Sequence, residues 1–211
     1  MKFVAISDTH NKHPQHLPEG DVLIHAGDVT GKGTEAQVYH FLDWFSAQPH
    51  RYKVFIAGNH DFYFEKTNPE MIAKMIPDNV IYLNDSGVTI EGIKIWGSPI
   101  QPWFNDWAFN RNRGNPIKKH WDLIPNDTDV LMTHGPVYMR LDRTASGFNA
   151  GCMDLLTAIR RVRPQYHICG HIHEAYGEMT EGLTTYINAS VLNLNYDLVN
   201  QAIEFEVEKR I

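Results

Sequence analysis

Short apolar runs recur along the chain, and each stops abruptly at glycine or at a charged or polar residue. Such runs are too short for helices, and they lack the polar alternation of strands with one face in water. Continuous apolar strands are typical of parallel sheets that are covered on both faces. We therefore expect buried strands at the following places: Lys2–Ser7, Val22–His25, Tyr52–Ala57, Val130–Met132 and Tyr166–Cys169.

Between these runs the apolar residues change to helical spacing. Within Thr34–Ala47 the side chains of Val38, Phe41 and Phe45 fall on one helical face, and Thr34 is a suitable N-cap. Similar spacing predicts three further helices, over Pro69–Ile76, Ile117–Leu123 and Asp154–Val162. Strands that alternate with helices predict an α/β fold with parallel pairing.

Other segments indicate antiparallel strands and one long loop. Val88–Trp96 alternates across a Glu91-Gly92 turn, which is typical of a hairpin. Gly97–Asn115 is irregular but rich in aromatic residues, so we expect an ordered, functional loop. Short strands are predicted over Val80–Leu83, Ala175–Met179, Thr184–Ile187 and Ile203–Val207.

The composition narrows the function classes. The 211 residues are 43% hydrophobic, which suits a single domain over 1–211. Acidic residues outnumber basic ones by 25 to 19, so polymeric nucleic acid is not an expected partner. Cys152 and Cys169 form no Cys-x-x-Cys pair, and we expect a reduced, cytoplasmic protein. No apolar run reaches the roughly 18 residues that cross a bilayer, so we expect no membrane insertion. The oligomeric state stays open.

The expected strands end in side chains that can bind metal. In open α/β sheets the carboxyl ends of the strands form the binding crevice, so these side chains should converge. Two carboxylates, one amide and four imidazoles suit Mn, with Fe, Zn, Ni or Co as alternatives. Seven ligands are too many for one ion, whereas two ions about 3.5 to 4 Å apart would use all of them. The seven are Asp8, His10, Asp28, Asn59, His134, His171 and His173.

The order of these motifs resembles that of the calcineurin-like metallophosphoesterase superfamily, from Asp-x-His at Asp8 to Gly-His-x-His ending at His173. The resemblance implies a four-layer α/β/β/α sandwich of two mixed β-sheets. It also implies that one metal is held by Asp8, His10, Asp28 and His173. The other is held by Asp28, Asn59, His134 and His171, so that Asp28 bridges the two.

A narrower resemblance rests on Gly97-Ser98-Pro99, Thr133-His134-Gly135-Pro136 and the run from Gly170 to Gly177. These phrases are similar to the small metallophosphoesterase-domain-containing family known from brain cyclic-nucleotide phosphodiesterases. Vertebrate members can carry glycine at the first histidine of Gly-His-x-His, which weakens their catalysis, whereas this chain has His171. The resemblance implies a small phosphodiester or nucleotide substrate, with 2',3'- or 3',5'-cyclic nucleotides as candidates.

Candidate catalytic residues follow the third expected strand. A metal-bridging hydroxide would attack phosphorus, and His60 is the candidate general acid for the leaving alkoxide. Asp61 is the candidate for orienting His60. His25 and His167 precede the ligand turns, and we interpret them as core residues or as supports behind the ligands.

The aromatic loop supplies candidate substrate contacts. An aromatic face can stack on a base, and a guanidinium can bind phosphate. The alternative is that this loop only packs over the edge of a sheet. The candidates are Trp103, Phe104, Arg111 and Arg113.

Two other functions compete with the phosphodiesterase. The first is a phosphomonoesterase or protein phosphatase, although serine/threonine phosphatases of the superfamily carry an arginine soon after Gly-Asp, where this chain has Val29-Thr30-Gly31. The second is a non-catalytic nucleotide-binding or scaffold protein. Scaffold members typically lack some of the metal-binding residues or the equivalent of His60. This chain has all seven expected metal-binding residues and His60.

Overall fold

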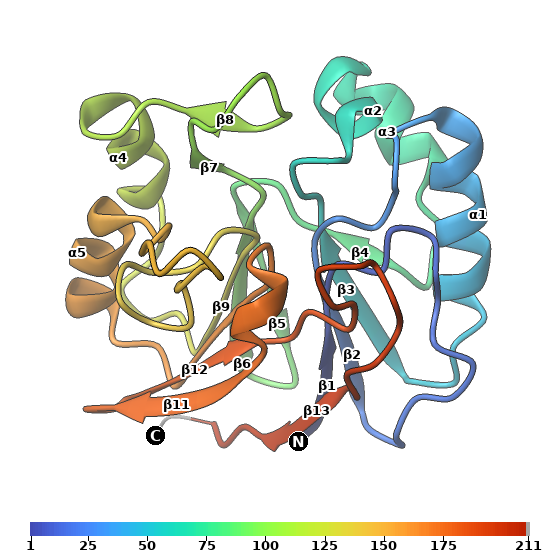
Figure 1. The fold of residues 1–211 in the computed structure, drawn as a ribbon. Coiled ribbons are helices and arrows are strands. Elements are labelled where there is room, and N and C mark those ends of the chain that lie inside the picture. Colours follow the sequence, from blue (N-terminus) through green and yellow to red (C-terminus); the bar gives the residue numbers. More distant parts are fainter. Residues whose placement is uncertain (210–211) are drawn as a thin grey trace.

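Two mixed β-sheets face each other in the computed structural model, which describes residues 1–209 (Figure 1). The first sheet has the strand order β13-β1-β2-β3-β4. Strands β1 to β4 are parallel, and β13 pairs with β1 in the antiparallel direction. The bounds are β1 (Lys2–Ile6), β2 (Val22–Ala26), β3 (Tyr52–Ile56), β4 (Ile81–Tyr82) and β13 (Ile203–Glu206).

The second sheet has the order β11-β12-β10-β9-β6-β5. Its four inner strands are parallel, and the two edge strands are antiparallel to their neighbours. The bounds are β5 (Ser86–Ile90), β6 (Ile93–Ser98), β9 (Val130–Thr133), β10 (Tyr166–Cys169), β11 (Gly177–Glu181) and β12 (Thr184–Asn188).

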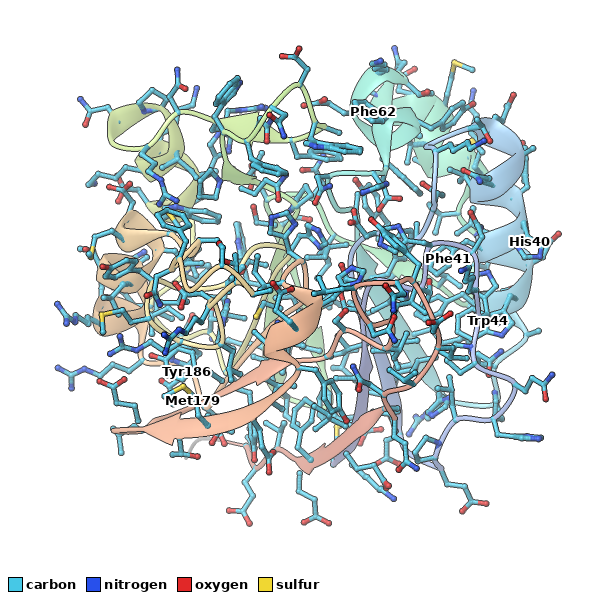
Figure 2. All side chains as sticks on the ribbon, in the orientation of Figure 1. His40, Phe41, Trp44, Phe62, Met179 and Tyr186 are labelled. Atoms are coloured by element: carbon cyan, nitrogen blue, oxygen red, sulfur yellow. The ribbon has the colours of Figure 1, made fainter. Side chains whose placement is uncertain are left out.

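Helices cover the outer face of each sheet (Figure 1). The first sheet is covered by α1 (Glu35–Ser46), α2 (Phe62–Lys66) and α3 (Pro69–Met75), and the second by α4 (Asn115–Trp121) and α5 (Met153–Val162). Figure 2 shows Phe41 on the side of α1 that faces the sheet and His40 on the opposite side. The predicted four-layer α/β/β/α sandwich is therefore confirmed. No helix within residues 1–209 is long and apolar enough to cross a membrane.

Successive residues of the inner strands pack on opposite faces. In β2, Leu23 belongs to the cluster under the helices, whereas Ile24 packs between the two sheets with Ile56 and Met132. Both faces of these strands are buried, which explains why the strands are apolar at consecutive positions.

Three segments differ from the sequence prediction. The helix α2 was not predicted, because five residues show too little periodicity. The loop Gly97–Asn115 contains β7 (Gln101–Pro102) and β8 (Asn110–Arg111), which pair in parallel. The predicted strand Ala175–Met179 begins only at Gly177, because the short 3-10 helix η1 (His173–Ala175) precedes it.

Candidate metal centre

The structure brings the seven predicted ligands together at one end of the two sheets. Each ligand lies within a few residues of the end of a parallel strand, and six of the seven side chains are buried. The strands and ligands are β1 with Asp8 and His10, β2 with Asp28, β3 with Asn59, β9 with His134, and β10 with His171 and His173.

Unusual backbone conformations place these side chains. Asp8, His10, Asp28 and His171 have φ values of 55°, 44°, 53° and 70°, in the left-handed region that non-glycine residues rarely adopt. Such strain persists only where the surrounding structure imposes it, and it concentrates at functional sites. Gly170 permits a close approach as well, because a Cβ there would lie 2.0 Å from Oδ2 of Asp8.

Asp28 lies between two groups of ligands. Its Oδ2 is 3.4 Å from Nε2 of His134 and 3.7 Å from Nε2 of His10. Nε2 of His173 is 3.5 Å from Oδ1 of Asp8. Three sets of side chains each offer ligand atoms within 4.8 Å of one another: Asp8, His10 and His173; Asp8, Asp28 and His134; and His10, Asp28 and His60.

Three of the four imidazole rings present their Nε2 atoms to the carboxylates of Asp8 and Asp28. In three ligands, Nδ1 lies within hydrogen-bond distance of a backbone carbonyl: His10 with Thr30 at 3.2 Å, His134 with Ala26 at 3.0 Å, and His173 with Asn193 at 3.0 Å. Since a carbonyl can only accept, Nδ1 carries the proton and Nε2 is the basic atom. Nε2 of His10 is buried and has no hydrogen-bond partner within residues 1–209. This donor set fits divalent cations.

The electrostatics also favour cations. Burial alone would raise the pKa of Asp28, but the neighbouring His134 and His10 hold it well below its usual range. Burial alone would lower the pKa of His134, yet the charge and hydrogen bond of Asp28 raise it to about 9. For His173, Asp8 outweighs burial in the same way and raises the pKa to about 9. The two buried carboxylates therefore create a field that attracts positive charge.

His60 and Asp61 are adjacent but make different contacts. Nδ1 of His60 donates to the carbonyl oxygen of Gly31 at 2.9 Å. The Asp61 carboxylate instead accepts from the backbone nitrogens of Val29, Thr30 and Gly58 and from the Thr30 hydroxyl. The orienting contact that we expected from Asp61 is thus made by Gly31, and Asp61 joins the two ligand turns.

A cavity of about 620 Å³ opens over the ligands. Of the four predicted substrate contacts, Trp103, Phe104 and Arg113 line it. Arg111 does not line this cavity, and its guanidinium lies 3.6 Å from the carboxylate of Glu65.

Three further aromatic residues lie in the cavity wall and are not among the four predicted substrate contacts: Trp107, Phe148 and Tyr196. Trp107 lies in the loop Gly97–Asn115, and the high number of aromatic residues in that loop could have indicated it as a substrate contact. Phe148 and Tyr196 lie on loops with no pattern that marks them.

His25 and His167 occupy equivalent places behind the ligands. Nε2 of His25 is 3.0 Å from the hydroxyl of Thr9, and Nε2 of His167 is 2.8 Å from the hydroxyl of Thr133. Each threonine is next to a ligand in the sequence. These contacts agree with the interpretation of both histidines as supports.

Comparisons with known proteins agree with this geometry. Residues 1–175 match the family model for calcineurin-like phosphoesterases. The chain is 44% identical to metallophosphoesterase domain-containing protein 1 of Homo sapiens, over 98% of this chain and 71% of that protein. It is 38% identical to a UPF0046 protein of Caenorhabditis elegans, over 100% of this chain and 76% of that protein.

A solved structure supports the fold. Phosphopantetheinyl hydrolase from Mycobacterium tuberculosis superposes with a TM-score of 0.61 at 15% identity, over 92% of this chain and 90% of that one. The family match over residues 1–175 and the relatives at 44% and 38% identity show that the chain belongs to the calcineurin-like phosphoesterase family of metal-dependent phosphoesterases.

Proposed function

We propose that the protein is a binuclear phosphodiesterase that hydrolyses small phosphodiesters, with 2',3'- or 3',5'-cyclic nucleotides as substrates. The observation that carries this proposal is the position of Asp28, whose Oδ2 faces His134 at 3.4 Å and His10 at 3.7 Å. A single carboxylate that faces both ligand groups is what a bridged pair of ions requires. Manganese is the expected metal, with iron, zinc, nickel or cobalt as alternatives.

The division of ligands between the two ions is the one that the family resemblance implies. One ion would be held by Asp8, His10, Asp28 and His173. The second would be held by Asp28, Asn59, His134 and His171. When bound, two divalent cations lower the pKa of a water molecule and neutralise charge on the phosphoryl oxygens.

His60 would supply the proton for the leaving group. Its Nδ1 donates to Gly31, which leaves Nε2 free to carry a second proton. One of its ring nitrogens belongs to a set of ligand atoms, with His10 and Asp28, that lie within 4.8 Å of one another. When the phosphorus–oxygen bond breaks, the electron pair stays on the leaving oxygen, and that oxygen takes the proton of Nε2.

The first experiment compares a diester with a monoester. Metal-loaded protein is assayed with bis-p-nitrophenyl phosphate and with p-nitrophenyl phosphate, with and without chelator. We expect faster turnover of the diester and loss of all turnover with chelator. Faster turnover of the monoester would favour a phosphomonoesterase, and no metal-dependent turnover of either ester would favour a non-catalytic protein.

The second experiment tests the role of His60. We expect His60→Gln to retain two metals per chain and to lose kcat most on diesters with poor leaving groups, because these need the proton most. An equal loss on good and poor leaving groups would remove His60 from the role of general acid.

A further inference from the structure

The wall of the cavity carries most of the exposed aromatic surface of the protein. Four of the five exposed aromatic side chains within residues 1–209 line it. They form what we call the aromatic collar: Trp103 (59% exposed), Phe104 (50%), Phe148 (65%) and Tyr196 (40%). The fifth, Tyr39, lies on α1 outside the cavity. Aromatic side chains gathered in this way at one cavity indicate a ligand with flat apolar surfaces.

The aromatic collar reaches both ends of the ligand set. The ring of Tyr196 lies 5.0 Å from that of His10 and 5.3 Å from that of His173, which are ligands of the first proposed ion. The ring of Phe104 lies 6.1 Å from that of His171, a ligand of the second. A phosphate held between the two ions would therefore have an aromatic surface on each side.

Hydrogen bonds fix the backbone at three of these four aromatic residues. The amide of Trp103 donates to the carbonyl of Arg111 at 2.8 Å, and the side-chain amide of Asn110 donates to the carbonyl of Phe104 at 3.1 Å. On the other side, Nζ of Lys12 donates to the carbonyl of Tyr196 at 2.6 Å. A fixed backbone lowers the entropy that these segments lose when a ligand binds.

The cavity wall that carries the aromatic collar is poor in lysine and arginine within residues 1–209. Among the lysines and arginines within residues 1–209, only Arg113 lies in the cavity wall. Its two terminal nitrogens donate to the carbonyls of Gly151 and Ala150, at 2.9 and 3.0 Å. A ligand with several phosphates would meet only this one cation, which is already bonded to two carbonyls, and the net charge of −6 adds general repulsion.

We propose that the best substrates are linear phosphodiesters with one phosphate and a flat, uncharged group on each side of it, as in a dinucleoside monophosphate. This inference rests on the proposed phosphodiesterase function and sharpens its substrate class. A cyclic nucleotide has one base and leaves one side of the aromatic collar uncovered. Hydrolysis forms a bond from a water oxygen to phosphorus and breaks one ester bond, and it releases a nucleoside and a nucleoside monophosphate.

The test compares three substrates on the metal-loaded enzyme. They are the deoxyadenosine dinucleotide with one phosphate, the tetranucleotide with three, and 3',5'-cyclic AMP. We expect kcat/KM for the dinucleotide to exceed that for the cyclic nucleotide by about tenfold, because stacking of a second base contributes an effect of that order. We also expect kcat/KM for the dinucleotide to exceed that for the tetranucleotide. Equal or lower values for the dinucleotide in either comparison overturn the inference.

Substitutions test whether the aromatic collar causes the preference for the dinucleotide. Tyr196→Ala and Trp103→Ala should each lower kcat/KM for the dinucleotide about tenfold, and in at least one of them the loss should be larger for the dinucleotide than for the cyclic nucleotide. Tyr196→Phe should keep the activity on the dinucleotide. Tyr39→Ala should leave kcat/KM unchanged for both substrates. Equal losses on both substrates in both alanine variants overturn the inference.

A failure of this inference can be separated from a failure of the proposed function. Turnover of bis-p-nitrophenyl phosphate without a preference for the dinucleotide overturns only the substrate class. Absence of metal-dependent turnover of any diester overturns both.

Discussion

The imidazole of His60 lies against the indole of Trp107, with ring centroids 4.2 Å apart and planes inclined by 30°. Gly31 holds one edge of the same imidazole through Nδ1. Trp107 is itself fixed, because the next residue, Ala108, donates its backbone amide to the carbonyl of Asn59 at 3.1 Å. The loop that carries Trp107 is thus tied to the turn that carries His60.

Removal of the indole should loosen the imidazole without disturbing the metals. We expect Trp107→Leu to lower kcat about tenfold on diesters with poor leaving groups and less on p-nitrophenyl esters, because misplacement affects the step that needs the proton. Trp107→Phe keeps a flat surface and should retain more activity. The measurements are kcat against leaving-group pKa and metal content. A uniform loss across leaving groups would contradict a role through His60.

Asp28 should be essential for binding two ions. We expect Asp28→Asn to bind at most one manganese ion per chain, since an amide lacks the charge that a bridging ligand supplies. Metal content is measured after dialysis against manganese, with the exposed Asp43→Asn as control, which should bind as the wild type does. Two retained ions in Asp28→Asn would show that another residue bridges.

Asp61 should act as a structural tie between two ligand turns. In Asp61→Asn, one carboxylate oxygen becomes an NH₂ group that faces backbone N–H donors. We expect a loss of about 2 to 4 kcal/mol in unfolding free energy, because buried donors lose their acceptor. Urea unfolding measures this loss. A change below about 0.5 kcal/mol, the level expected of an exposed site, would contradict it.

The convergence of the ligands could be predicted from the sequence, whereas the cavity wall could not. Asp8, Asp28 and Asn59 each follow a short apolar strand, and parallel pairing brings the ends of such strands to one edge. Their positions therefore follow from local pattern and general sheet geometry. Two turns at this edge also need glycine, because a Cβ at Gly58 would lie 2.4 Å from Oδ1 of Asp28 and a Cβ at Gly170 would lie 2.0 Å from Oδ2 of Asp8.

Other features depend on contacts between distant segments. Tyr196 reaches the site because its carbonyl accepts from Lys12 and because its backbone is left-handed, with φ of 61°. Likewise β13 joins the first sheet by pairing with β1 at the opposite end of the chain. A local periodicity carries no information about such pairings, which explains why the sequence analysis did not assign them.

His167 should make stability depend on pH. Its ring is fully buried, its Nε2 lies beside the hydroxyl of Thr133, and burial lowers its pKa to about 3. The folded state therefore keeps the imidazole neutral, while the unfolded chain takes up a proton below about pH 6.5. Proton uptake by the unfolded state destabilises the fold as the pH falls, by about 1.4 kcal/mol per pH unit between about 6 and 3.

The variant His167→Leu removes this linkage. It should be less stable than the wild type at pH 8, because the hydrogen bond to Thr133 is lost, but the difference should shrink by about 1.4 kcal/mol for each pH unit below 6. Urea unfolding of chelator-treated protein between pH 8 and 5 measures the difference, with the exposed His16→Leu as a control that should run parallel to the wild type. A difference between wild type and His167→Leu that stays constant with pH would show that His167 is not the buried neutral histidine that limits stability in acid.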